Sequence, residues 1–317
     1  MKLHYHISAY YPTNFGDALN AWLWPRLLPD ILNEDSSSLF VGIGTLLNDT
    51  LPAGPVKAIF GTGVGYGKAL PTVDERWNIY CLRGPLSAYA IGQDKALAIT
   101  DSAVLVRLVL PNAPTSRYLV SFMPHCKSTD YWDWDAICAY ADIHFINPLA
   151  PVEQVLTEIQ SSQVVMSEAM HGAIVSDALR VPWVPVQVFP HILEFKWRDW
   201  TSSVNLPYIP ERLQPTYPFE ESVARVNDRL HRTRLGKYVR AASASPLGRL
   251  TRDTSIRCGK HYKWSVAPIN DRRSIQLARS LRKTAETAVP TMSTDVMMED
   301  VTAKLQGALD RFRADWS

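Results

Sequence analysis

The side chain best suited to proton transfer in this sequence is His171, in the run SEAMHG at residues 167–172. It falls in the first turn of an expected helix (169–180) that follows an expected strand (163–167). Open α/β sheets bind ligands at the carboxyl ends of their strands, and an imidazole exchanges protons near neutral pH. The position therefore predicts a general acid or base, with a purely structural histidine as the alternative.

Three cationic side chains are candidates for holding an anionic substrate. Arg83 ends an expected strand and is followed by Gly-Pro, so its guanidinium would meet a carboxylate or phosphate at a sheet edge. A structural ion pair is the alternative for this residue. Lys196 and Arg198 alternate with aromatic residues over 195–200, a pattern that can stack a sugar ring and hold an anion. The alternative there is a helix whose tryptophans pack in the core.

A strand-to-helix junction near the amino terminus is a candidate anion site. Asn14, Gly16 and Asp17 lie between an expected strand (2–8) and an expected helix (17–28). Free N–H groups and the positive end of the helix dipole meet at such a junction. A simple helix cap is the alternative reading of the same residues.

A glycine-rich stretch, GTGVGYGK at residues 61–68, contains Gly63 and Gly65. It matches neither GxGxxG before a helix nor GxxxxGK[ST], which disfavours a nucleotide-fold dehydrogenase or an ATPase. The two remaining interpretations are a flexible rim against a phosphorylated ligand and a plain glycine-rich loop.

The elements that must position these residues alternate between apolar runs and helical patterns. The expected strands are 2–8, 39–43, 56–61, 77–83, 96–99, 117–123, 142–146, 163–167 and 183–188, and the expected helices between them are 17–28, 85–92, 130–140, 151–161 and 169–180. Continuous apolar strands separated by helices are typical of parallel sheets. Two such series predict an α/β protein with two doubly wound, Rossmann-like domains.

Turn-rich and proline-rich stretches set the expected domain boundaries. A break at 110–114 predicts domains at 1–112 and 113–206. Beyond these, residues 207–317 are expected to form a proline-rich arm and a helical, basic extension. Its expected helices are 219–240, 271–288 and 299–316.

The net charge of the chain conceals an uneven distribution. The 33 Lys and Arg nearly cancel the 31 Asp and Glu, so no nucleic-acid partner is indicated. Residues 231–283, however, contain 14 basic and 2 acidic side chains, a net charge of +12. Such a segment predicts a patch for anionic lipid head groups or a polyanionic substrate, or else a solvated helical face.

Several classes of protein are excluded by composition. The four cysteines have no metal-ligand spacing, so no metal site is expected, and they are typical of reduced cytosolic thiols. No run reaches the ~18 apolar residues of a membrane span, and the start lacks the features of a signal peptide. A cytoplasmic location is therefore expected.

Taken together, these residues resemble the polysaccharide pyruvyl transferase family. The resemblance covers about residues 1–205, and it rests on NFGD at 14–17, the glycines near 61–67, Arg-Gly-Pro after a strand, Asp101-Ser102-Ala103, and the MHG helix followed by Val-Pro and Lys196. The sequence is most similar to the branch that decorates exopolysaccharides such as succinoglycan. Other branches tend to carry an arginine where this chain has Ala169, so another cation must replace that contact.

The resemblance implies transfer of pyruvate from phosphoenolpyruvate to two hydroxyls of a terminal sugar, giving a cyclic ketal and phosphate. It also implies a two-domain, GT-B-like arrangement with the active site in the cleft. His171 would be the general acid or base, and Asp17 or Glu168 would orient it or accept a proton. The substrate-binding residues would be Asn14, Gly16, Gly63, Gly65, Arg83, Ser102, Lys196 and Arg198. This reaction requires no cofactor and no metal.

The acceptor implied by the resemblance is a lipid-linked oligosaccharide, so peripheral association with an anionic membrane through residues 231–283 is expected. Two other classes remain open, a glycosyltransferase that uses a nucleotide sugar and a non-catalytic carbohydrate-binding protein. The sequence does not specify the acceptor sugar, the ketal position or the oligomeric state.

Overall fold

The first sheet contains four short parallel strands. The computed structural model describes residues 1–65, 69–110, 116–189, 192–214 and 272–317. The strands are β1 (Lys2–His4), β2 (Ser38–Val41), β3 (Val56–Phe60) and β4 (Trp77–Cys81), in the order β1-β2-β3-β4. Every residue of β2 and all but the first of β3 are buried, as expected for apolar parallel strands covered on both faces.

Helical segments connect these strands and follow the last of them. They are α1 (Phe15–Leu27), α2 (Pro85–Ala90) and the 3-10 helices η1 (Lys95–Leu97) and η2 (Ser102–Leu108). The predicted strand at 96–99 is wrong, because η1 occupies its first two residues. The Asp94 carboxylate accepts a hydrogen bond from the Ala96 N–H at 2.8 Å, which starts a 3-10 turn, and only the Leu82–Ala98 bridge is sheet-like.

The second sheet contains five parallel strands. They are β5 (Tyr118–Met123), β6 (His144–Phe145), β7 (Ser162–Ser167), β8 (Trp183–Gln187) and β9 (Glu211–Arg212), in the order β6-β5-β7-β8-β9. The strand order therefore reverses at β5, the reversal typical of a doubly wound sheet. Among the described strands of the first sheet the order shows no reversal.

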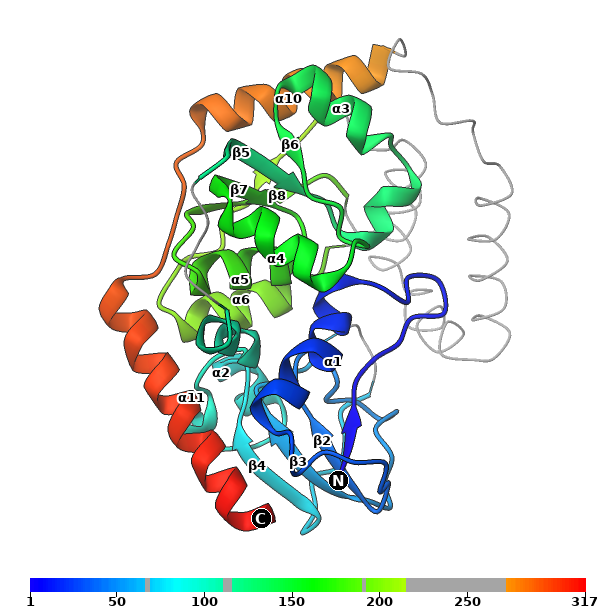
Figure 1. Ribbon diagram of the computed structural model, residues 1–317, viewed down its shortest axis with the longest axis vertical. Coiled ribbons are helices and arrows are strands. Elements are labelled where there is room, and N and C mark those ends of the chain that lie inside the picture. Colours follow the sequence, from blue (N-terminus) through cyan, green and yellow to red (C-terminus); the bar gives the residue numbers. More distant parts are fainter. Residues whose placement is uncertain (66–68, 111–115, 190–191, 215–271) are drawn as a thin grey trace, which may run out of the picture.

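Five helical segments belong to this second half, and they include the predicted MHG helix. They are η3 (Cys126–Asp130), α3 (Trp134–Ala141), α4 (Val152–Gln160), α5 (Met170–Ala178) and α6 (Glu194–Ser203). Figure 1 shows α5 and α6 between the two sheets, so the MHG helix lies at the junction. Trp197 and Trp200 of α6 are fully buried, which confirms the alternative that the tryptophans of 195–200 pack in the core.

The two C-terminal helices pack on different halves of the protein (Figure 1). α10 (Arg272–Thr287) places Leu277 and Leu281 in a hydrophobic cluster with Trp134 of α3. α11 (Asp295–Trp316) returns to the first sheet, where the Phe312 ring makes edge contacts with Phe40 and Tyr80, with centroids 5.0 and 5.3 Å apart. Within the described ranges, no helix has the length and hydropathy needed to cross a bilayer. Most of the basic segment 231–283 lies outside the described residues, and its last twelve residues begin α10.

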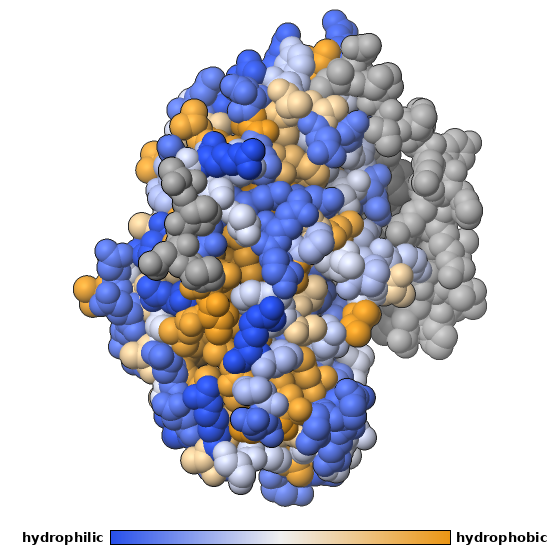
Figure 2. Space-filling model, in the orientation of Figure 1, coloured by the Kyte–Doolittle hydropathy of each residue, from blue (hydrophilic) through white to orange (hydrophobic). Residues whose placement is uncertain are grey.

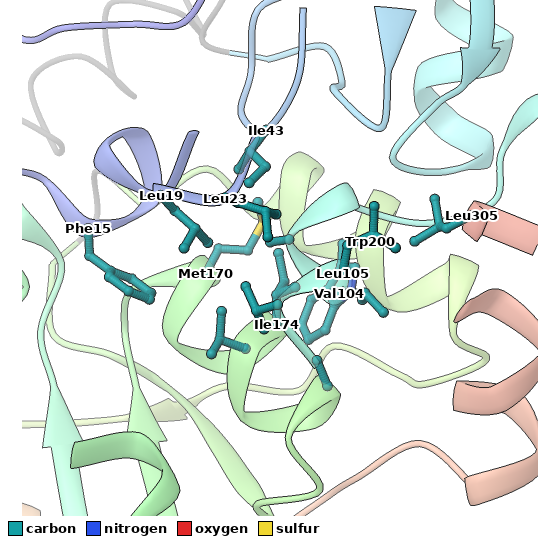
Figure 3. Close-up of a cluster of buried hydrophobic side chains, with 14 of the residues drawn as sticks. Phe15, Leu19, Leu23, Ile43, Val104, Leu105, Met170, Ile174, Trp200 and Leu305 are labelled. Carbon is teal, nitrogen blue, oxygen red and sulfur yellow. The ribbon is translucent and has the colours of Figure 1, made fainter. Parts of the chain in front are cut away.

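One continuous hydrophobic core joins the two sheets (Figure 3). It contains side chains from α1, η2, α5, α6 and α11, namely Phe15, Leu19, Leu23, Val104, Leu105, Met170, Ile174, Trp200 and Leu305. Burying one such side chain fully stabilises a fold by roughly 1.5–3 kcal/mol. The junction between the sheets is therefore a packed interface, and it holds the elements that carry the candidate residues in fixed positions.

Candidate active site

His171 lies at the junction of the two halves, in the first turn of α5. Its imidazole contacts two elements of the first half, the start of α1 and the start of η2. The Nε2 atom lies 3.7 Å from Oδ2 of Asp101, and the side chain is 16% exposed. The candidate acid or base thus belongs to a helix of the second half, and its imidazole packs against residues of the first half.

Gly16 is required for the close approach of His171 to α1. A Cβ added to Gly16 would overlap the imidazole, lying 2.8 Å from its Cγ and 2.9 Å from its Cε1. Real side chains do not tolerate such distances, so only glycine allows this packing. The glycine of NFGD and the histidine of MHG therefore depend on each other, because the His171 ring packs in the space that the missing side chain of Gly16 leaves.

Asn14 and Asp17 form a side-chain pair at the same end of α1. The Asn14 amide donates to Asp17 Oδ2 at 2.7 Å, and within the described residues its side chain makes no capping bond to the helix backbone. The Phe15 N–H donates to the carbonyl of Pro148 at 2.9 Å. One N–H at the start of α1 is thus used to fix the helix to the second half.

Glu168 is fully buried, directly after β7. Its carboxylate accepts hydrogen bonds from four donors among the described residues, namely the His125 N–H (3.0 Å), the Ser128 hydroxyl (2.6 Å), the Val188 N–H (2.9 Å) and the Phe189 N–H (3.0 Å). The donors follow β5 and β8, the two neighbours of β7. This carboxylate ties together the loops at the carboxyl edge of the second sheet.

Arg83 is fully buried as well, and it makes four hydrogen bonds within the protein. The acceptors are Asp199 Oδ2 (2.9 Å), the Gly44 carbonyl (3.3 Å), Thr45 Oγ1 (3.0 Å) and the Val64 carbonyl (2.7 Å). Because Asp199 belongs to α6, the pair connects the two halves. This arrangement favours a structural ion pair over a substrate-binding role for Arg83.

The glycines after β3 serve close packing in this structure. A Cβ on Gly63 would lie 2.5 Å from Nη2 of Arg83, and one on Gly65 would lie 2.9 Å from Cγ2 of Thr45 and 3.0 Å from Cδ2 of Leu193. Gly63 therefore makes room for the guanidinium, and Gly65 lets the loop approach the start of α6.

The side chains of Ser102 and Arg198 interact with residues other than His171. The Ser102 hydroxyl is buried and donates to the Phe60 carbonyl at 2.9 Å, which fixes η2 to the end of β3. The Arg198 side chain is 56% exposed and pairs with Glu194 one turn earlier at 3.2 Å. Neither contact involves His171.

Lys196 is buried, with 7% exposure, on the inner side of α6. Burial raises the pKa of the nearby Cys126 thiol to about 11, and the negative charge of Asp17 adds to that shift. The positive charges of Lys127 and Lys196 oppose it. Asp17 in the first turn of α1 and Lys196 in the first turn of α6 therefore both lie within electrostatic reach of the Cys126 thiol, at the start of η3.

Sequence reasoning missed two features of this site. Asp101 is predicted only as part of the Asp-Ser-Ala motif, because no helix is expected over residues 102–108 that it could cap. In the structure it caps η2, and its carboxylate faces His171. His125 and Cys126 follow β5 at the carboxyl edge of the second sheet. Arg83 is selected because it follows a strand at the carboxyl edge of a sheet, and the same criterion would also select these two residues. In the described part of the chain, no cluster of three or more His, Cys, Asp or Glu side chains is arranged to hold a metal.

The fold and the junction site define an α/β enzyme with two parallel sheets, and the sequence matches the polysaccharide pyruvyl transferase family over residues 4–188. The chain belongs to that family and is a pyruvyl transferase family enzyme, as the motifs predict. Among named proteins, it is similar to the succinoglycan biosynthesis protein ExoV of Rhizobium meliloti (strain 1021). The two are 40% identical over 218 residues, which cover 67% of this chain and 68% of the relative.

Proposed function

We propose that this enzyme transfers the pyruvyl group of phosphoenolpyruvate to two hydroxyls of one terminal sugar of an exopolysaccharide. One hydroxyl adds to C2 of the enol while C3 takes up a proton and becomes a methyl group. The bond between C2 and the phosphate oxygen then breaks, and the second hydroxyl adds to C2 and loses its proton. The products are a cyclic pyruvate ketal and inorganic phosphate, so two hydroxyl protons are released and one is taken up at carbon.

The observation that carries this proposal is the position of His171 between the two halves of a family member. The reaction needs a group that both gives and takes protons, and an imidazole is well matched to that work near neutral pH. His171 is only partly exposed, and it is held by α1 and η2 on the opposite side of the junction. Asp17 lies at the same end of α1 and is the carboxylate proposed to assist it.

Lys196 is the cation that we propose for the anionic groups of the donor. It is buried within electrostatic reach of the Cys126 thiol, on which Asp17 also acts, whereas Arg198 pairs with Glu194 at the surface. Arg83 is engaged with Asp199, so we assign it to holding the two halves together. Lys196 is thus proposed to replace the family arginine whose place Ala169 takes.

We further propose a lipid-linked acceptor at the cytoplasmic face of a membrane and a GT-B-like arrangement of the two sheets. The similar protein from Rhizobium meliloti is named for succinoglycan biosynthesis, which supports an exopolysaccharide acceptor. Figure 2 shows hydrophilic residues with some apolar ones at the upper end of the molecule, where Figure 1 places α3 and α10. The exposed side chains of α10 include Arg272, Arg273, Arg279 and Lys283, which suit an anionic lipid surface.

The test is phosphate release from phosphoenolpyruvate in the presence of a panel of lipid-linked and synthetic acceptor glycans. His171→Asn should lower kcat by about 10²–10⁴-fold, the usual contribution of a positioned acid or base. His144→Asn is the matched control, because His144 Nε2 also lies 3.7 Å from a carboxylate oxygen, that of Glu158, but on β6. Turnover of nucleotide sugars instead of phosphoenolpyruvate, or full activity of His171→Asn, would contradict the proposal.

A further inference from the structure

Two buried polar atoms face each other across the junction without completing a hydrogen bond. Oδ2 of Asp101 and Nε2 of His171 are 3.7 Å apart, and neither has a hydrogen-bond partner among the described residues. Asp101 is fully buried. Buried polar atoms are nearly always paired, so an unpaired donor and an unpaired acceptor aimed at each other call for an explanation.

The other oxygen of Asp101 has an ordinary structural role. Oδ1 accepts a hydrogen bond from the Ala103 N–H at 3.0 Å and caps η2. That bond fixes the carboxylate and directs Oδ2 away from the helix, towards the imidazole. Because η2 packs directly on α5, the carboxylate and the imidazole are held at a set separation.

We propose that Asp101 is a positioning residue for His171, accepting a hydrogen bond from Nε2–H and so keeping that proton on Nε2. The gap exceeds a hydrogen bond by about 0.7 Å, since N–H···O bonds are near 2.9–3.0 Å, and such bonds are often long before substrate is bound. The exchangeable proton of the reaction is then carried by Nδ1, on the Gly16 side of the ring. This role rests on the function proposed above for His171.

The variant that separates the capping role from the positioning role is Asp101→Asn. Asparagine and aspartate are equally good helix caps, so the Oδ1 bond to Ala103 is retained. The Oδ2 acceptor that faces His171 is replaced by an uncharged amide NH2, which cannot accept a hydrogen bond from Nε2–H. Asp94→Asn is the matched control, because Asp94 caps η1 through the same bond to the N–H two residues on and lies on the surface.

Asp101→Asn should lower kcat at least about tenfold, up to the 10²–10⁴-fold that a positioned acid or base contributes. KM for phosphoenolpyruvate and the melting temperature should stay close to those of Asp94→Asn, because Asp101 acts through the ring and not on the donor. A wild-type kcat for Asp101→Asn would overturn the proposal, and so would a loss of activity explained by a lower melting temperature.

A double-variant cycle distinguishes failure of this inference from failure of the proposed function. If the carboxylate acts through the imidazole, Asp101→Asn should have no further effect on kcat in a His171→Asn background. Effects that multiply would refute the coupling while leaving His171 in its role. Full activity of His171→Asn alone would instead remove His171 from the mechanism, which is the failure of the proposed function.

Discussion

Replacement of Arg83 by methionine tests whether this arginine binds the donor or holds the two halves of the enzyme together. Its guanidinium is fully buried and bonds Asp199 on α6, so the substitution leaves a buried carboxylate without its cation. Asp199 would keep two other hydrogen bonds, from the N–H and the hydroxyl of Ser87, but neither supplies a positive charge.

The magnitude follows from that burial. Removing one partner of a buried ion pair typically destabilises a protein by about 3–5 kcal/mol, because the remaining charge is desolvated and unpaired. Arg83→Met should therefore lower the free energy of unfolding by about that amount. Adding Asp199→Leu should restore part of the loss, since the double variant no longer buries an isolated charge.

Urea unfolding followed by tryptophan fluorescence measures this effect, because Trp197 and Trp200 are buried on the same helix as Asp199. Arg76→Met is the control, since Arg76 pairs with Asp74 at the surface of the same half and its loss should leave the unfolding midpoint close to wild type. A wild-type midpoint for Arg83→Met, together with a raised KM for phosphoenolpyruvate, would refute the reasoning and return Arg83 to the donor site.

Three further predictions concern other residues of the candidate site. Gly16→Ala should lower kcat and destabilise the fold by about 1–3 kcal/mol, because its methyl group overlaps the His171 ring, whereas Gly54→Ala, with nothing within 4 Å, should match wild type in kcat and melting temperature. Glu168→Gln should reduce the free energy of unfolding by about 1–3 kcal/mol in urea titrations, because an amide nitrogen would face two of the four donors that the carboxylate now satisfies. Cys126, whose pKa is raised to about 11, should stay largely protonated at pH 8 and react with iodoacetamide only near pH 11 or after unfolding; rapid labelling of the native enzyme at pH 8 would contradict its burial.

Several features of this protein are determined by short stretches of sequence. The runs LFVGI and VKAIFG are apolar apart from Lys57, and such runs are typical of strands in a parallel sheet covered on both faces, so strands β2 and β3 could be predicted. The start of α5 was predictable from the motif around His171, because the strand-to-helix change is a local pattern. The strand expected at 96–99 was wrong because one capping bond from Asp94 outweighed a weak apolar run.

The roles of individual site residues depend on partners far away in sequence, and only the tertiary structure decides them. Arg83 has the same local signal whether it meets a substrate or a protein carboxylate, and the choice was made by Asp199, 116 residues later. The local sequence around Gly16 predicts a site where a ligand approaches the backbone, but in the structure the His171 ring occupies that space.

Asp101 and His171 show most clearly which features depend on local sequence and which depend on tertiary packing. The sequence by itself determines that His171 lies at the start of a helix, because helix initiation depends on neighbours a few positions away. The cap that Asp101 gives to η2 is also a local interaction, although no helix is predicted there. That the carboxylate and the imidazole face each other at 3.7 Å depends on how η2 packs on α5 across the shared core. Packing of that kind is set by the shapes of many buried side chains at once, and no local pattern in the chain encodes it.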